Sequence, residues 1–229
     1  MPQGKRFKEA LKQVDRDTYY PLAEAVALAK QTATAKFDET IEMHFRLGID
    51  PRHSDQQVRS TVMLPNGTGK SVRILVFAEG EDARVAEAAG ADIIADDEVI
   101  SRIQDGWFEF DAALAVPSMM GKVGKIARVL GPRGLMPNPK AGTVVQPNDI
   151  ERAIGELQAG RVEFRNDKTG NLHIPVGKAS FEQDKLVENA EAVVEAVNRV
   201  KPAGVKGTYI RRVTIAATMG PGVRVDLNA

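Results

Sequence analysis

The residues with the strongest chemical character in this sequence are cationic and lie in a stretch rich in glycine and proline. Residues 121–140 carry five Lys or Arg side chains, no acidic residue and the run Gly131-Pro132-Arg133-Gly134. Glycine lets a backbone approach a ligand, proline restricts the chain, and the bases supply charge, a combination that suits contact with a phosphate backbone. A structured connection with solvated bases has the same composition, so the composition alone leaves both interpretations open.

A second candidate is the run Gly67-Thr68-Gly69-Lys70-Ser71, which has part of the pattern of a phosphate-binding loop. The full pattern requires glycine five positions before Gly69, where this chain has Leu64. A strand pattern over 72–78 follows where a helix would have to begin and direct its N-terminus at phosphate. We therefore interpret the run as a glycine hinge with an exposed lysine, and keep a nucleotide-dependent enzyme as an alternative.

Catalytic and metal-binding patterns are sparse. His44, His53 and His173 lack metal-ligand spacing, and none pairs locally with a candidate nucleophile. The sequence has no cysteine, which excludes disulfides, thiolate-bound zinc and cysteine nucleophiles. We expect neither enzymatic activity nor a bound cofactor or metal.

A polar row follows a predicted strand at 40–49, where apolar residues alternate with Thr40, Glu42, His44 and Arg46. This period of two predicts a half-buried strand with these side chains on its exposed face. Such a row often serves solubility alone. A carboxylate there can also accept hydrogen bonds from ribose 2′-hydroxyls or guanine amino groups in the shallow minor groove of RNA.

The segment 161–178 reads as a β-hairpin with a cationic turn. The strand patterns Arg-Val-Glu-Phe-Arg and Asn-Leu-His-Ile-Pro-Val-Gly-Lys flank the turn residues 166–170. Arg165 and Lys168 place positive charge there, although the same residues also suit an ordinary turn. This turn becomes a candidate binding element because other polar segments of the chain could act together with it.

The order of the patterns predicts two domains. We expect helices at 5–14, 21–32, 81–89, 96–105, 119–130 and 148–158, an amphipathic helix around 186–197, and strands at 40–49, 58–64, 72–78, 92–95, 112–116, 143–145 and 209–217. The alternation of strands and helices in the middle predicts a Rossmann-like, three-layer α/β insert at 67–159. Residues 1–66 and 160–229 then form one discontinuous α+β sheet domain, with Gly67, Gly69 and Gly160 as hinge residues.

Charge is distributed unevenly between these parts, although the chain has 31 basic and 31 acidic residues. The insert has 10 basic and 14 acidic residues, a net charge of −4, so the discontinuous domain has +4. Within the insert, residues 79–111 carry 11 acidic residues and only two basic ones. A protein-interaction module that uses this acidic face is a second alternative. The neutral total therefore does not exclude a nucleic-acid-binding surface.

The sequence shows no pattern of membrane insertion or export. Its longest apolar runs are too short to span a bilayer, and the basic segment at 1–15 lacks the apolar core of a signal peptide. We expect a soluble, intracellular protein.

Four motifs together resemble the family of the bacterial large-subunit ribosomal protein number one (L-one), the protein of the mobile side stalk. They are Ala35-Lys36-Phe37-Asp38-Glu39-Thr40, the run from Leu130 to Lys140, the run from Gly160 to Gly170, and Thr218-Met219-Gly220-Pro221. The resemblance covers essentially the whole chain. It implies a structural protein of the large ribosomal subunit, cytoplasmic and monomeric when free, whose discontinuous domain binds 23S ribosomal RNA. It further implies help in releasing deacylated tRNA from the exit site and repression of its own operon mRNA.

The resemblance also implies which residues contact RNA. In the discontinuous domain these are Lys36, Phe37, Thr40, Glu42, Arg165, Asp167, Lys168, Gly170, His173, Thr218, Met219 and Gly220. Arg133 and Lys140 of the insert are the expected secondary contacts. Lys and Arg would supply the salt-sensitive share of affinity, while Thr40, Glu42, Asp167 and Thr218 would discriminate between RNAs.

Overall fold

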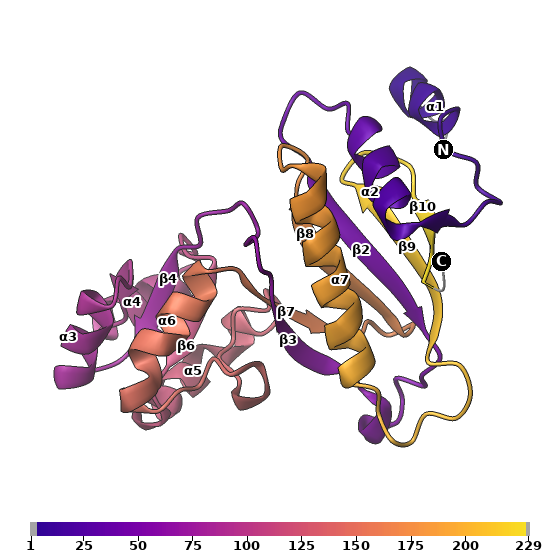
Figure 1. Cartoon of the computed structure of the whole chain (residues 1–229). Helices are drawn as coiled ribbons and strands as arrows, with labels where there is room; N and C mark the ends of the chain where they lie inside the picture. The colour runs from indigo at the N-terminus through magenta and orange to yellow at the C-terminus, as the bar shows by residue number, and fades with distance from the viewer. Residues whose placement is uncertain (1–3, 228–229) are drawn as a thin grey trace. The chain divides into compact units, whose positions relative to one another are not determined.

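The computed structural model describes residues 4–227 and divides the chain into two compact units. One unit contains the described residues up to Gly69 together with those from Gly160 onward. The other is Lys70–Ala159. Each unit is described by itself below (Figure 1).

A five-stranded sheet forms the centre of the discontinuous unit, with the strand order β1-β10-β9-β2-β8. All neighbouring strands are antiparallel except β1 and β10, which are parallel. The strands are β1 (Tyr20–Pro21), β2 (Thr40–Leu47), β8 (Asn171–Lys178), β9 (Ile210–Ala217) and β10 (Val223–Asp226). The central pair, β2 and β9, thus joins segments from the two ends of the chain.

Two helices cover one face of this sheet (Figure 1). Helices α2 (Leu22–Gln31) and α7 (Gln183–Arg199) pack with the sheet in a single apolar core. From β2 that core receives Ile41, Met43, Phe45 and Leu47, all almost fully buried, so the alternation read from the sequence is confirmed. The remaining helical segments of this unit are α1 (Lys5–Leu11) and the 3₁₀ turn η1 (Ser54–Gln56).

The hairpin expected at 161–178 is wrong. Strand β7 (Arg161–Arg165) pairs with β3 (Arg59–Met63) in a separate two-stranded sheet, whereas β8 pairs with β2. The turn 166–170 therefore connects two sheets rather than two partner strands. Local turn residues predicted the reversal of the chain, but the choice of partner depends on which strand each segment meets across the fold.

The insert has the predicted three layers. Its parallel sheet has the order β5-β4-β6, built from β4 (Ile74–Phe77), β5 (Ile93–Ile94) and β6 (Ala112–Ala115). Leu75 and Phe77 pack in a core with α4 (Asp97–Gln104) and α5 (Met120–Leu130). Ile74 and Val76 pack in a second core with α3 (Glu81–Ala88) and α6 (Ile150–Gln158). The 3₁₀ turns are η2 (Pro117–Met119), η3 (Pro139–Ala141) and η4 (Pro147–Asp149).

Three strand assignments differ from the sequence analysis. The expected strand at 143–145 is a single parallel bridge between Val144 and Ala115. The two-residue β1 and the C-terminal β10 were not predicted; β10 follows the glycine- and proline-rich run 218–222. After Gly69-Lys70-Ser71 the first regular element is β4, so no helix N-terminus stands where a nucleotide phosphate would need one.

The two chain crossings meet beside helix α7. Gly67, Gly69 and Gly160 all have positive φ angles, of 67°, 73° and 108°. A Cβ atom on Gly160 would lie 2.5 Å from the Cα of Gly67, so the two backbones touch and Gly160 has no room for a side chain. The first crossing is also fastened to α7, because the buried Asn189 side chain accepts from Asn66 N (3.0 Å) and donates to Gly67 O (3.0 Å).

Two further observations concern residues 4–227 only. No helix in this range is both long and apolar enough to cross a bilayer. Over the same residues, no group of three or more His, Asp or Glu side chains is arranged to hold a metal ion.

We predict that Asn189→Ala lowers the free energy of unfolding by about 3 kcal/mol. The change leaves Asn66 N–H, Gly67 O and Val176 O without their present partner, and each unsatisfied buried group costs about 1–3 kcal/mol. Denaturant titration measures the loss. Asn198→Ala is the matched control, since Asn198 lies exposed on the same helix. Equal stability of the two variants would contradict the fastening role of Asn189.

Candidate nucleic-acid interface

The predicted contact residues of the discontinuous unit follow the face of the sheet opposite to α2 and α7. On this face β2 places Thr40, Glu42, His44 and Arg46, which are half-buried or exposed. Six residue steps from Thr40 to Arg46, at about 3.3 Å each, make this row about 20 Å long. The antiparallel register sets Thr40 opposite Lys178 at one end and Arg46 opposite Asn171 at the other. The row therefore has a first end at Thr40, a second end at Arg46 and a centre at His44.

At the first end the structure brings four predicted residues together. Thr40 N donates to Thr218 Oγ1 (3.0 Å), and Thr218 N donates to Thr40 O (3.0 Å). Met219 follows directly, and Gly220 N donates to Ala217 O (3.0 Å) to close the turn. A Cβ on Gly220 would meet Ala217 Cβ at 3.2 Å and Thr32 Oγ1 at 3.3 Å. Close packing within the protein therefore explains the glycine at this position.

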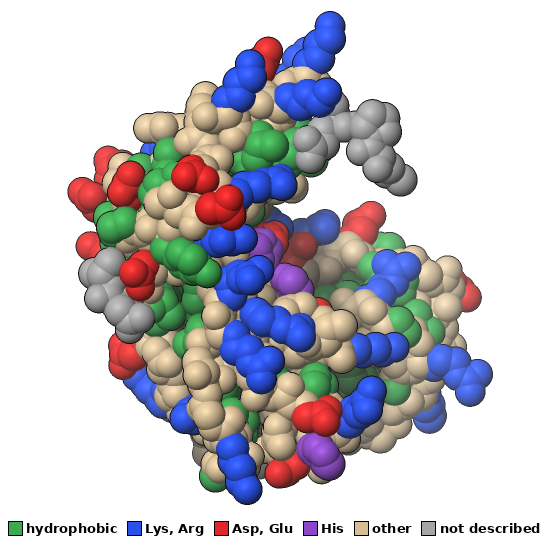
Figure 2. All heavy atoms as spheres, turned by 90° about the vertical axis from the view of Figure 1, so that its right-hand side faces the viewer, with side chains coloured by type: hydrophobic (Ala, Val, Ile, Leu, Met, Phe, Trp, Pro, Cys, Tyr) green, Lys and Arg blue, Asp and Glu red, His purple; other side chains and the backbone are tan. Residues whose placement is uncertain are grey.

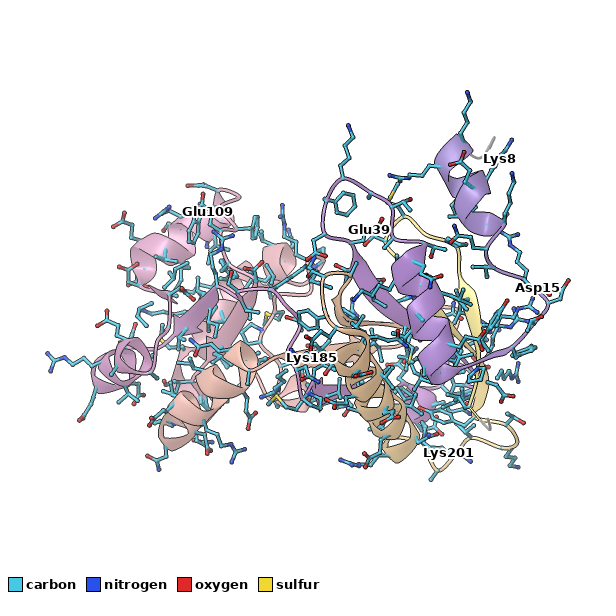
Figure 3. The ribbon with its side chains drawn as sticks, turned by 45° about the horizontal axis from the view of Figure 1, so that its top comes forward. Lys8, Asp15, Glu39, Glu109, Lys185 and Lys201 are labelled. Carbon is cyan, nitrogen blue, oxygen red and sulfur yellow. The ribbon has the colours of Figure 1, made fainter. Side chains whose placement is uncertain are left out.

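The residue that organises this end, Glu39, was not predicted. Glu39 is 1% exposed, and its carboxylate accepts from Ala35 N through Oε1 (2.7 Å) and from Met219 N through Oε2 (2.8 Å). It lies next to the start of β2 (Figure 3). One side chain therefore joins the loop that carries Lys36 and Phe37 to the turn that carries Met219. A signal existed in the sequence, because Glu39 continues the buried phase of the alternation in β2.

Two large apolar side chains are exposed at the same end. Phe37 is 55% exposed and Met219 is 50% exposed, although both lie beside backbone held by Glu39. Surface apolar groups on a fixed backbone can pack against the flat face of a base without losing much conformational freedom.

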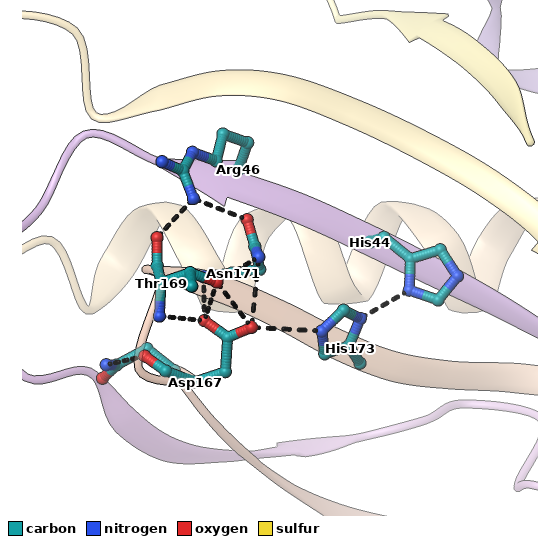
Figure 4. A network of polar contacts seen from close by, with 7 residues as sticks. His44, Arg46, Asp167, Thr169, Asn171 and His173 are labelled. Carbon is teal, nitrogen blue, oxygen red and sulfur yellow. Dashed lines mark hydrogen bonds and ion pairs between the residues drawn. The ribbon is translucent and has the colours of Figure 1, made fainter. Parts of the chain in front are cut away.

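At the second end Asp167 holds the turn 166–170. Its carboxylate accepts from Thr169 N (2.8 Å), Asn171 N (2.8 Å), Thr169 Oγ1 and Asn171 Nδ2 (Figure 4). Burial alone would raise the pKa of Asp167, but the hydrogen bonds from Asn171 and Thr169 outweigh it and hold the pKa well below its usual range. The expected role of Asp167 was discrimination between RNAs. In this structure the Asp167 oxygens already accept hydrogen bonds from the protein. Lys168 is exposed in the same turn, so its positive charge is accessible to a ligand.

A histidine pair occupies the centre. His44 Nδ1 lies 2.9 Å from His173 Nδ1, with the rings edge to face, and His173 Nε2 lies 3.7 Å from Asp167 Oδ2 (Figure 4). A hydrogen bond between the two Nδ1 atoms requires that one of them carries no proton. Burial, and next the neighbouring His173, lower the pKa of His44, while Glu42 acts in the opposite direction.

Two clefts open on the sides of His173. One, of about 700 Å³, is lined among others by Arg59, Arg165, Asp167 and Lys168. Arg59 forms an ion pair of 2.5 Å with Glu163, whereas Arg165, opposite Arg59 in the β3–β7 pair, and Lys168 are exposed cations. The second cleft, of about 440 Å³, lies on the side of β9 and is rich in arginine.

The model of the family described as ribosomal protein L1p/L10e matches residues 29–221. The chain belongs to this family. Membership supports a structural role in the ribosome and the binding of ribosomal RNA, and families of this kind are generally non-enzymatic.

In this family member the insert presents its basic residues in a specific way. The Arg133 guanidinium lies 3.6 Å from the centre of the Phe108 ring, and Arg102 lies over Trp107 at 4.4 Å. A stacked guanidinium keeps the N–H groups at its edge available. Lys140 is exposed on η3. Lys122 instead pairs with Glu79 (2.6 Å) and Asp97 (2.8 Å), so it neutralises acidic residues of the insert.

We predict that Glu39→Gln disorders the first end of the row. An amide offers one acceptor where two backbone N–H groups need one each, so a donor faces a donor and unfolding becomes easier by about 1–3 kcal/mol. The amide NMR signals of Ala35 and Met219 should shift together. Glu191→Gln, at an exposed position of α7, is the control. Unchanged signals at both sites would contradict the link through Glu39.

We predict that His44 titrates below its ordinary pKa of 6.5. The unfolded chain then takes up the proton first, so the stability that neutral His44 contributes is complete above about pH 6.5 and is lost as the pH falls through the folded-state pKa. NMR titration of the ring signals measures this directly. His173→Gln should raise the pKa of His44 only in part, because burial remains. A pKa of His44 at or above 6.5 in the wild type would contradict this assignment.

Proposed function

We propose that the discontinuous unit binds 23S ribosomal RNA across the open face of its sheet. The observation that carries the proposal is the polar row of β2 with shaped contacts at both ends, in a member of a ribosomal protein family. Phe37 and Met219 would pack against bases at one end, with Lys36 and Thr218 beside them. Arg165, Lys168 and the Gly170 turn would meet phosphates at the other, since exposed cations supply the salt-dependent part of RNA affinity.

Glu42 is the discriminating residue of this proposal. It faces Ala216 on β9 and Pro175 on β8, two side chains without charge, and within residues 4–227 it forms no ion pair or side-chain hydrogen bond. A carboxylate on such a shallow surface repels phosphate but accepts hydrogen bonds from 2′-hydroxyl or guanine amino groups. The protein would thus read the minor-groove shape of an RNA that is already folded.

The finer roles are extensions of this binding. We propose that the protein is of bacterial type and acts in the cytoplasm on the mobile stalk, where it assists the release of deacylated tRNA from the exit site. The insert would add secondary contacts through Arg133 and Lys140 and would move on Gly67, Gly69 and Gly160. The free protein would be a monomer, and its own operon mRNA would be bound by the same surface for repression.

The direct test is crosslinking in cell extract, followed by sequencing of the attached RNA. We expect a dominant site in the large-subunit ribosomal RNA, together with tRNA and the message that encodes this chain. Reads spread evenly over all cellular RNA would refute the proposal. Ribosomal reads without tRNA or the encoding message would restrict the function to ribosomal RNA binding.

We predict that Glu42→Ala lowers affinity for large-subunit ribosomal RNA by about 1–3 kcal/mol through lost hydrogen bonds. Preference over small-subunit ribosomal RNA should fall as well, while the salt dependence stays nearly constant because no cation is removed. Filter binding at several salt concentrations measures all three quantities. Glu191→Ala on α7 controls for the change in net charge. Affinity that is unchanged or higher in Glu42→Ala would contradict the proposed role of the sheet face.

A further inference from the structure

Three arginines line the cleft of about 440 Å³ on the open face of the sheet. Arg46 comes from β2, and Arg211 and Arg212 come from β9. His44, His173, Asn171 and Thr214 complete the polar part of its wall. None of the three arginines is among the RNA contacts that the sequence predicted. Lys and Arg side chains gather next to histidines on this face of the molecule (Figure 2).

A β-bulge brings two consecutive arginines to the surface. Arg46 pairs with Arg212, but the next residue of β2, Leu47, pairs with Ile210, so Arg211 is the extra residue on β9. In a regular strand neighbouring side chains point to opposite faces, and one of the two would enter the core. Here both Arg211 and Arg212 are exposed and both line the same cleft.

The pairing of Arg46 with Arg212 is electrostatically unfavourable in the free protein. Like charges directly opposite each other on adjacent strands destabilise a sheet, and arginine stays protonated at all physiological pH values. Arg46 cannot move away easily, because its guanidinium donates to Thr169 O and to Asn171 Oδ1 (3.1 Å for the latter) (Figure 4). A fixed cation opposite a second cation creates an unbalanced positive site.

Acidic side chains of the protein do not balance this charge. Within residues 4–227, none of these three arginines forms an ion pair with Asp or Glu. The Asp167 carboxylate, in the turn that Arg46 contacts through Thr169 O, already accepts hydrogen bonds from Thr169 and Asn171. An anion from outside is therefore the missing partner. Planar guanidinium groups match the two oxygens of a phosphate and bind it through paired hydrogen bonds.

We propose that Arg46, Arg211 and Arg212 form a binding site for a backbone phosphate of RNA. The inference rests on the proposed function, because it assumes that RNA lies on this face of the sheet, and it adds a third anchoring point on the β9 side of the polar row. Arg46 is held in place by the turn 166–170, while Arg211 and Arg212 supply the donors that are not otherwise engaged. The site adds affinity without reading the base sequence.

The test compares Arg212→Gln and the double variant Arg211→Gln/Arg212→Gln with wild type, using protein-free large-subunit ribosomal RNA at several salt concentrations. We expect about tenfold weaker binding for each arginine removed, from the loss of a charge-assisted contact. The slope of log affinity against log salt should fall by about 0.7–0.9 for each. Arg212→Lys should keep the slope, since the charge remains. Arg84→Gln, in the acidic stretch of the insert, should change neither quantity.

Stability gives a second readout. Removal of a like-charge pair should leave the free energy of unfolding of Arg212→Gln equal to or above that of wild type at low salt. A clear loss of stability together with an unchanged salt slope would show that Arg212 is structural and would overturn the proposal. Arginine variants with wild-type affinity would overturn it too. If Glu42→Ala still weakens binding in that case, only the arginine site fails; if wild type shows no preference for this RNA, the proposed function itself fails.

Discussion

The arrangement of this protein's surface depends on one constraint: α2 and α7 both pack on the same face of the five-stranded sheet. An antiparallel sheet with one covered face alternates between core and open surface along each strand. Ile41, Met43, Phe45 and Leu47 therefore belong to the core, and the residues between them stay accessible. Because β8 and β9 pair antiparallel with β2, their open-face side chains lie beside those of β2 on one surface.

Three acidic residues near this surface have different roles because their surroundings differ. Glu39 is buried and satisfies two backbone N–H groups, so it fixes two loops relative to each other. Asp167 is saturated by its own turn and shapes the opposite end. Glu42 stands between uncharged neighbours and keeps its hydrogen-bonding capacity for an external partner. Residue type alone does not separate these roles; exposure and hydrogen-bond partners do.

The cations of this protein differ in how far their charge remains available to a ligand. Arg59 and Lys122 are neutralised by carboxylates of the protein, whereas Arg46 and Arg212 face each other across a strand pair. A protein that binds a polyanion gains affinity from cations that are not already paired, at some cost to its own stability. Stacking of Arg133 on Phe108 is a third arrangement, in which an aromatic ring orients the cation without cancelling its charge.

Much of this organisation followed from the sequence by itself. A period of two predicted β2, a helical period predicted α7, and short apolar runs alternating with helical patterns predicted the insert, because each of these patterns lies in neighbouring residues. Tertiary structure decided what the local pattern does not contain: that β7 pairs with β3 instead of β8, that β10 joins the sheet between β1 and β9, and that the Asp167 oxygens accept hydrogen bonds from their own turn. It also decided the bulge at Arg211, since a bulge is defined only by the register of two strands. Local periodicity is set by neighbouring residues, whereas strand pairing, register and the hydrogen-bond partners of a side chain are defined only once the chain has folded.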